Sequence, residues 1–181
     1  KHLNLELKTI PGTSEIVSGR AQISELRDVS PEDLLGRDPV SPVPELMSQN
    51  ITGKNVMVSG AGGSIGSELC RQILAYAPTS LVLYEMSEFG LYQIQTELTE
   101  TAQRMGSATK ILPVLGSVQH VRRLEAAIEG FAVETIYHAA AYKHVPLVEE
   151  NVVEGIRNNV FGTLAIARAA KKYNVGNFIL I

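Results

Sequence analysis

Four glycines between residues 60 and 66 constrain this chain more than any other part of the sequence. They follow an apolar run, residues 56–58, that lacks polar alternation and therefore predicts a parallel strand buried on both faces. An amphipathic helix is predicted directly after them. Gly60, Gly63 and Gly66 are spaced three apart, which permits a tight turn, close approach of a pyrophosphate and close helix–strand packing. Because the start of the helix offers free amides and a positive dipole end to a phosphate, we predict a dinucleotide-binding turn.

An acidic residue follows the second predicted strand. This strand covers residues 81–84 and ends at Glu85, about 20 residues beyond the last glycine of the turn, where a carboxylate hydrogen-bonds an adenosine ribose. Such an acid favours NAD, because the 2′-phosphate of NADP requires a nearby arginine, although NADP remains an alternative. The competing interpretations are a plain glycine-rich turn and, for Glu85, a charge at a helix N-terminus. The order strand, turn, helix, strand makes a dinucleotide site the preferred interpretation.

Composition excludes several classes of function. With 45% hydrophobic residues the 181-residue chain can form a sizeable core, and its net charge of −3 gives no argument for nucleic acid or an acidic membrane surface. The single Cys70 is interpreted as a small buried residue and fits a reducing cytoplasm. No metal site is expected, because His138 and His144 have no further ligand at suitable spacing. No signal peptide or membrane-spanning apolar run is visible, and the missing initiator methionine and apolar final residues suggest that both ends are cut.

Two regions are expected along the chain. Residues 1–50 are rich in proline and are interpreted as an N-terminal extension and linker, the tail of an upstream domain, with a short strand near residues 3–8 and a short helix capped by Ser30. Residues 51–181 alternate strands with helices and predict an α/β fold, a doubly wound parallel sheet with strand order 3-2-1-4-5. Pro113 places the third strand at the sheet edge. The predicted helices cover residues 64–76, 88–105, 118–129 and 150–173, and the later strands cover residues 111–115, 135–138 and 177–181.

Two further loops lie at the carboxyl ends of the strands, where ligands bind in such sheets. The loop after the third strand places Ser117 and Val118 against an adenine, and Ser117 is also a candidate helix N-cap. The loop after the fourth strand begins with three alanines, residues 139–141, whose small size lets a flat ring or a ribose approach the backbone. Both loops therefore belong to the predicted site.

Polar residues continue beyond the three alanines. Tyr142, Lys143 and His144 gather at the ligand end of the fourth strand, so a functional role is preferred over that of solvated surface residues. Asn158 and Asn159 lie inside the last predicted helix, where asparagine is unfavourable. We expect at least one of them to bond to backbone or water near the site, the alternative being a local cap.

Three stretches carry a family resemblance: residues 59–67, 138–146 and 158–163. They resemble the extended short-chain dehydrogenase/reductase superfamily and, more narrowly, the nucleotide-sugar 4,6-dehydratases of bacterial polysaccharide synthesis (the CapD-like or WbpM-like group). Residues 33–40 resemble the linker that precedes the catalytic domain in the long, membrane-attached members of that group. The resemblance implies a Rossmann fold with tightly held NAD(P) and UDP-N-acetylglucosamine as the usual substrate, converted to a 4-keto-6-deoxy sugar. In that reaction a hydride leaves C4 for the nicotinamide, water is eliminated across C5–C6, and the hydride returns to C6.

The resemblance also implies roles for individual residues. Those expected at the cofactor are Gly60, Gly63, Ser64, Ile65 and Gly66 at the pyrophosphate, Glu85 at the ribose, Ser117 and Val118 at the adenine, Ala139, Ala140 and Ala141 at the nicotinamide, and Asn159 at the reacting centre. Lys143 and His144 are expected on the substrate side.

The family's catalytic residues are expected beyond Ile181, in a Thr-Asp-Lys run followed by a Tyr or Met and a Lys. On this interpretation the 181 residues alone are inactive, and the parent protein is a lyase anchored at the cytoplasmic face of the membrane. The expected partners are a UDP-sugar and further copies of the chain. The apolar edge formed by residues 178–181 would either pair with another copy or belong to the ordered part of a longer chain. A nucleotide-sugar epimerase or reductase and a non-catalytic dinucleotide sensor remain alternatives.

Overall fold

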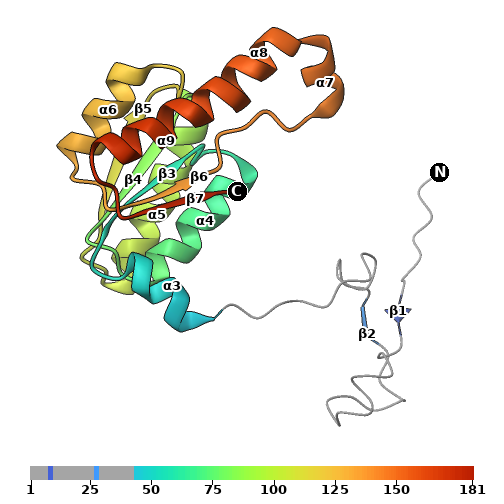
Figure 1. Ribbon diagram of the computed structural model, residues 1–181. Coiled ribbons are helices and arrows are strands. Elements are labelled where there is room, and N and C mark those ends of the chain that lie inside the picture. Colours follow the sequence, from blue (N-terminus) through green and yellow to red (C-terminus); the bar gives the residue numbers. More distant parts are fainter. Residues whose placement is uncertain (1–7, 10–26, 29–42) are drawn as a thin grey trace. The chain divides into compact units, whose positions relative to one another are not determined.

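The computed structural model describes residues 8–9, 27–28 and 43–181 (Figure 1), and the chain divides into two compact units, residues 1–42 and 43–181. In the first unit, β1 (Lys8–Thr9) pairs antiparallel with β2 (Arg27–Asp28). Most of the strand predicted near residues 3–8, the helix predicted after Ser30 and most of the linker lie outside the described residues.

The second unit begins with a helix that the sequence analysis did not predict. α3 (Pro44–Ile51) carries proline in its first turn, where the missing N–H is not needed. Its last residue, Ile51, is fully buried in a core cluster of the second unit, and Met47 packs against the same cluster. The contacts therefore place the division of the chain after Pro42, whereas the sequence interpretation placed it after residue 50.

Five parallel strands form the sheet of the second unit, in the order β5-β4-β3-β6-β7. This order is the predicted 3-2-1-4-5. The three central strands are almost entirely buried, as expected of parallel strands that are covered on both faces. Pro113 lies on β5 at the edge of the sheet, as predicted. The strands are β3 (Asn55–Ser59), β4 (Ser80–Glu85), β5 (Lys110–Leu115), β6 (Thr135–His138) and β7 (Asn177–Leu180).

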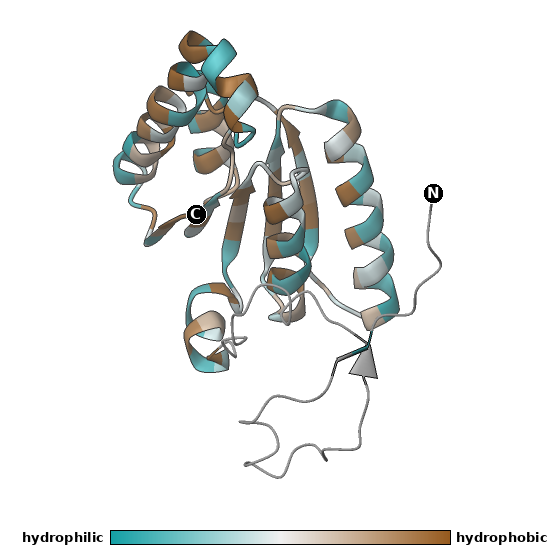
Figure 2. Cartoon of the chain, turned by 90° about the vertical axis from the view of Figure 1, so that its right-hand side faces the viewer, coloured by the Kyte–Doolittle hydropathy of each residue, from teal (hydrophilic) through white to brown (hydrophobic). Residues whose placement is uncertain are grey.

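Helices cover both faces of this sheet and divide the core into two clusters. Val56 and Val58 of β3 lie in the cluster beneath α4 (Ser64–Ala75) and α5 (Glu88–Met105). Met57, which points to the opposite face, lies in the cluster beneath α6 (Val121–Gly130) and α9 (Thr163–Lys172). In Figure 2 the strands between the helices carry hydrophobic colour along much of their length. The alternation of side chains along one strand thus builds both halves of a doubly wound core.

Cys70 belongs to the first of these clusters. It is fully buried and unpaired, and burial raises the pKa of its thiol, so it packs as a small apolar residue.

The long helix predicted over residues 150–173 is confirmed over most of its length, because α8 (Val152–Ile156), a π-helical segment η1 (Arg157–Gly162) and α9 follow one another without a break. The π-helical turn and a separate short helix before it, α7 (Val145–Glu150), were not predicted; α7 and α8 project away from the sheet (Figure 1). Asn151 has φ −127° and ψ 50°, outside the helical region, and its side-chain amide donates to Leu147 O at 2.9 Å.

Among the described residues no helix is long and apolar enough to cross a membrane.

Candidate cofactor site

The glycine turn between β3 and α4 requires glycine at two positions for steric reasons. Gly60 has φ +74°, and a Cβ there would lie 2.7 Å from Ala139 O. A Cβ on Gly66 would lie 1.9 Å from Gly60 O, inside any permitted contact distance. The turn therefore packs directly against the start of α4 and against the loop after β6.

The start of α4 presents free amides. The first hydrogen bond of the helix runs from Ser67 N to Gly63 O at 2.8 Å, so helix geometry gives the amides of Ser64, Ile65 and Gly66 no acceptor within α4. Gly63, Ser64 and Ile65 are exposed. With the positive end of the helix dipole, these groups form a site suited to an anionic oxygen.

Glu85 lies at the carboxyl end of β4 with only 7% of its surface exposed. One carboxylate oxygen accepts from Gly62 N at 2.9 Å, and the other accepts from Met86 N and Ser87 N, each at 2.8 Å. A Cβ on Gly62 would lie 2.8 Å from Gly90 C. The sequence analysis did not include Gly62 among the site residues, although its place as the fourth glycine of the turn was the available signal.

The loop after β5 lies beside Glu85. Tyr84 donates its hydroxyl to Ser117 O at 3.0 Å, and Val118 is 3% exposed in the core. Ser117 Oγ accepts from Gln119 N at 3.2 Å, but the residue that precedes α6 is His120. The interpretation of Ser117 as the N-cap of α6 is therefore wrong, because the helix begins three residues later than that role requires.

The loop after β6 is held by two asparagines of η1. Asn159 accepts from Tyr142 N at 2.8 Å and donates to Tyr142 O at 2.9 Å, and the buried Asn158 donates to Ala140 O at 3.3 Å. The expectation that at least one asparagine bonds to backbone near the site is confirmed. On the other side, Lys143 Nζ donates to Ser64 Oγ at 2.7 Å and connects the loop to the start of α4.

His138 lies behind this loop, 2% exposed, between Ser59 and Thr163. Burial lowers its pKa to about 4, so the imidazole is neutral at physiological pH. His144, by contrast, is exposed in front of α7.

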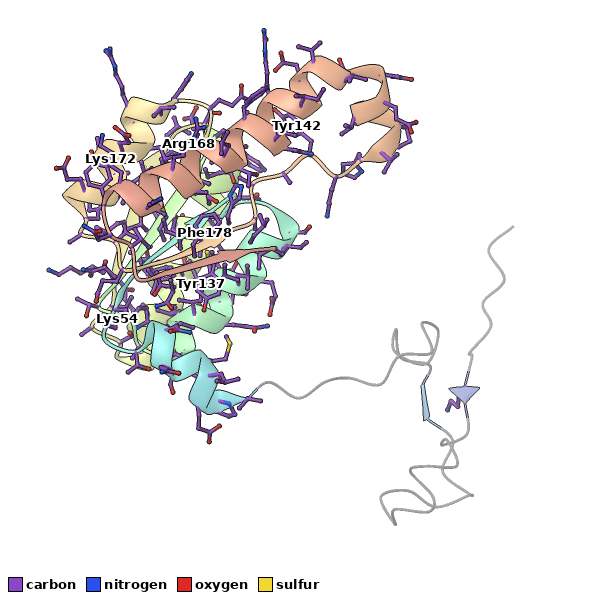
Figure 3. All side chains as sticks on the ribbon, in the orientation of Figure 1. Lys54, Tyr137, Tyr142, Arg168, Lys172 and Phe178 are labelled. Atoms are coloured by element: carbon purple, nitrogen blue, oxygen red, sulfur yellow. The ribbon has the colours of Figure 1, made fainter. Side chains whose placement is uncertain are left out.

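Two pockets meet at the glycine turn, one of about 250 Å³ beside Glu85 and one of about 640 Å³ beside Lys143. Figure 3 marks Tyr142 where the chain passes from the sheet toward α7, and this residue lines both pockets. The predicted residues in the smaller pocket are Gly60, Glu85, Ser117, Val118 and Ala140; those in the larger pocket are Ser64, Ile65, Gly66, Lys143 and His144; Gly63, Ala139 and Ala141 line both.

The remaining predicted residue, Asn159, lines neither pocket; Asn158 lines the smaller one instead. The structure also adds lining residues that the sequence analysis missed. Those of the smaller pocket include Gly62, Met86, Ser87 and Gly116, and those of the larger pocket include Leu147, Val148, Asn151, Glu154 and Gly155. The second group was missed because residues 145–149 were predicted as loop rather than as α7, and because the sequence pattern does not fix which face of the following helix lines a pocket.

Known proteins match this chain over most of its length. The capsular polysaccharide biosynthesis protein CapD of Staphylococcus aureus is 41% identical over 177 residues, 98% of this chain and 29% of that protein. A UDP-N-acetylglucosamine 4,6-dehydratase (inverting) of Campylobacter jejuni is 28% identical over 130 residues, 71% of this chain and 36% of that protein. The chain thus spans about a third or less of the length of these relatives.

Solved structures share the fold. Pen from Bacillus thuringiensis superposes with a TM-score of 0.64 at 26% identity, covering 72% of this chain and 39% of that one. UDP-glucose 4-epimerase from Bifidobacterium longum, solved with NAD+ and UDP, gives a TM-score of 0.58 at 21% identity, covering 70% and 36%. A family profile described as polysaccharide biosynthesis protein matches residues 56–181. On this match and the identity to CapD, the chain belongs to the polysaccharide biosynthesis protein family.

Proposed function

We propose that this chain forms the NAD-binding part of a nucleotide-sugar 4,6-dehydratase that acts on UDP-N-acetylglucosamine. The observation that carries the proposal is the pair of pockets joined at the glycine turn, with a fixed carboxylate at one end and an exposed lysine at the other. A dinucleotide has the matching layout, since its diphosphate lies between two nucleosides.

The residues present fit NAD. The free amides of Ser64, Ile65 and Gly66 would hold the diphosphate, and the steric requirement for glycine at positions 60 and 66 leaves the turn open for it. Glu85 would accept a hydrogen bond from the adenosine ribose, and its charge would repel the 2′-phosphate of NADP. When bound, NAD supplies reversible hydride transfer.

The larger pocket would take the nicotinamide half of NAD, with the reacting sugar beside it. Lys143 and His144 stand at its rim, and relatives named as capsular polysaccharide and UDP-N-acetylglucosamine 4,6-dehydratase proteins support a UDP-sugar substrate. Because the chain spans about a third or less of those relatives, the proposal assigns the catalytic acid and base to residues beyond these 181. It likewise assigns membrane attachment to other parts of the longer protein.

Calorimetry with NAD and NADP tests the cofactor site directly on this chain. We expect NAD to bind and NADP to bind at least tenfold more weakly. Turnover is tested on a protein that continues the chain to the length of its relatives, incubated with UDP-N-acetylglucosamine and followed by NMR. A 4-keto-6-deoxy product supports the dehydratase, a C4-epimeric sugar would indicate an epimerase, and NAD binding without any product would indicate a sensing module.

A further inference from the structure

A partly buried series of hydrogen bonds runs behind the wall that the two pockets share. His138 Nδ1 lies 2.6 Å from Ser59 Oγ, and its Nε2 lies 2.9 Å from Thr163 Oγ1. Thr163 Oγ1 in turn lies 2.7 Å from the main-chain carbonyl of Asn159. These hydrogen bonds thus connect β3 and β6 of the sheet to η1 and α9.

Chemistry fixes the direction of every bond in this series. A carbonyl only accepts, so the single hydroxyl proton of Thr163 goes to Asn159 O. Thr163 Oγ1 must then accept from His138, which places the proton of the neutral ring on Nε2. Nδ1 is left as an acceptor and receives the hydroxyl proton of Ser59. One tautomer satisfies the whole series, and burial holds the ring in its neutral form.

This series of hydrogen bonds determines the position of the loop after β6. The widened π-helical segment η1 aims the Asn159 side chain at Tyr142, whose N–H and C=O it both binds. Tyr142 lines both pockets and directly precedes Lys143, whose amine reaches Ser64. Loss of the Thr163 hydroxyl would therefore shift Asn159, whose two hydrogen bonds to Tyr142 carry the shift to a residue that lines both pockets.

We propose that His138 and Thr163 are positioning residues that set the place of residues 139–143, and with it the affinity of the site for its dinucleotide. The inference rests on the proposed function for the identity of the ligand. It differs from a purely structural role, in which the same hydrogen bonds would stabilise the fold without affecting the loop.

Three threonine variants of the full chain separate the two roles. T163V removes the hydroxyl at nearly constant volume, and T163S restores it. T99V is the matched control, because Thr99 Oγ1 makes the same bond to a carbonyl four residues earlier, Gln95 O at 2.7 Å, on the exposed surface of α5. Two quantities are measured for each variant: hydrogen exchange of the Tyr142 amide by NMR without ligand, and the Kd for NAD by calorimetry.

We expect T163V to speed exchange at Tyr142 at least tenfold and to raise the Kd for NAD at least threefold, T163S to restore both values, and T99V to change neither. Imidazole ¹⁵N shifts of the wild type should report a proton on Nε2 of His138. Unchanged exchange at Tyr142 in T163V would overturn the proposal, as would faster exchange with an unchanged Kd. If the wild type binds no NAD, the proposed function fails, while the exchange rates still decide for or against the positioning of residues 139–143.

Discussion

Glu85 has little hydrogen-bonding capacity left for a ligand. An ionised carboxylate offers about four acceptor positions, and three amides already occupy three of them. One position remains, so a ribose that binds here is expected to donate a single hydrogen bond. The same three amides fix the carboxylate before any ligand arrives, which removes the cost of orienting it.

Replacing Glu85 with alanine should weaken NAD binding by about 1.5–3 kcal/mol, the usual range for a hydrogen bond to a charged group. Calorimetry gives the affinity. Glu88→Ala is the matched control, since Glu88 is an exposed acid in the first turn of α5 only three residues away. Equal affinity of the Glu85 variant and the wild type would contradict the ribose role.

Glycine at position 66 is required by packing alone. Gly66→Ala should lower the free energy of unfolding by about 3 kcal/mol or more, because its Cβ cannot coexist with Gly60 O unless the turn moves. Gly130→Ala is the control, because no atom lies within 4 Å of a Cβ at that helical position. Chemical denaturation measures both, and a Gly66 variant as stable as the Gly130 variant would show that the turn relaxes freely.

At the scale of elements, the connection between β6 and α9 depends on a neutral histidine. The pKa of His138 falls from an ordinary value of 6.5 to about 4 in the folded state, so between these values the unfolded chain binds a proton that the folded chain does not. Stability from this source is complete above pH 6.5 and is lost as the pH falls toward 4, by up to about 3 kcal/mol. Urea unfolding at pH 7 and pH 4.5 should therefore show a larger loss for the wild type than for His138→Gln.

His120→Gln provides the comparison for this pH dependence, because His120 is exposed. Its variant should keep the steep dependence of the wild type. The same slope in the wild type and the His138 variant would contradict the prediction.

The elements also show where sequence reasoning succeeds and where it stops. Strand order follows from alternating apolar segments and from one proline, and neither requires knowledge of side-chain contacts. The short helix α7 and the π-helical segment that begins at Arg157 do not follow, because α7 is too short to show a helical period and a single π turn shifts the period of the long helix by less than the pattern resolves. Asn158 and Asn159 indicated an irregular helix in the sequence. Which of the two lines a pocket depends on the π-helical turn, which the sequence pattern does not reveal.

At the scale of the whole molecule, the two edges of the sheet differ. β5 carries Pro113 at one edge, whereas β7 at the other pairs only with β6 among the described strands and exposes 62% of Leu180. An apolar edge without proline is a template for strand pairing, so we propose that these 181 residues by themselves associate through β7, an edge that a later part of a longer protein would cover instead.

Light scattering across a concentration series measures this association. Leu180→Lys should shift the chain toward monomer, because a charge on an edge strand disfavours pairing. Leu115→Lys, at the end of the opposite edge strand, should leave the association unchanged. A wild type that stays monomeric throughout the series would contradict the prediction.

Gly63, Ala139, Ala141 and Tyr142 are common to the two pockets, so the pockets are two halves of one binding surface. When one nucleotide of a dinucleotide binds in one half, the covalent link holds the second nucleotide near the other half at a high effective concentration. Two separate mononucleotides instead each lose their own translational freedom on binding. AMP and nicotinamide mononucleotide should accordingly compete with NAD only at much higher concentrations, even when added together. This surface therefore recognises the covalent link between two nucleotides more than it recognises either base.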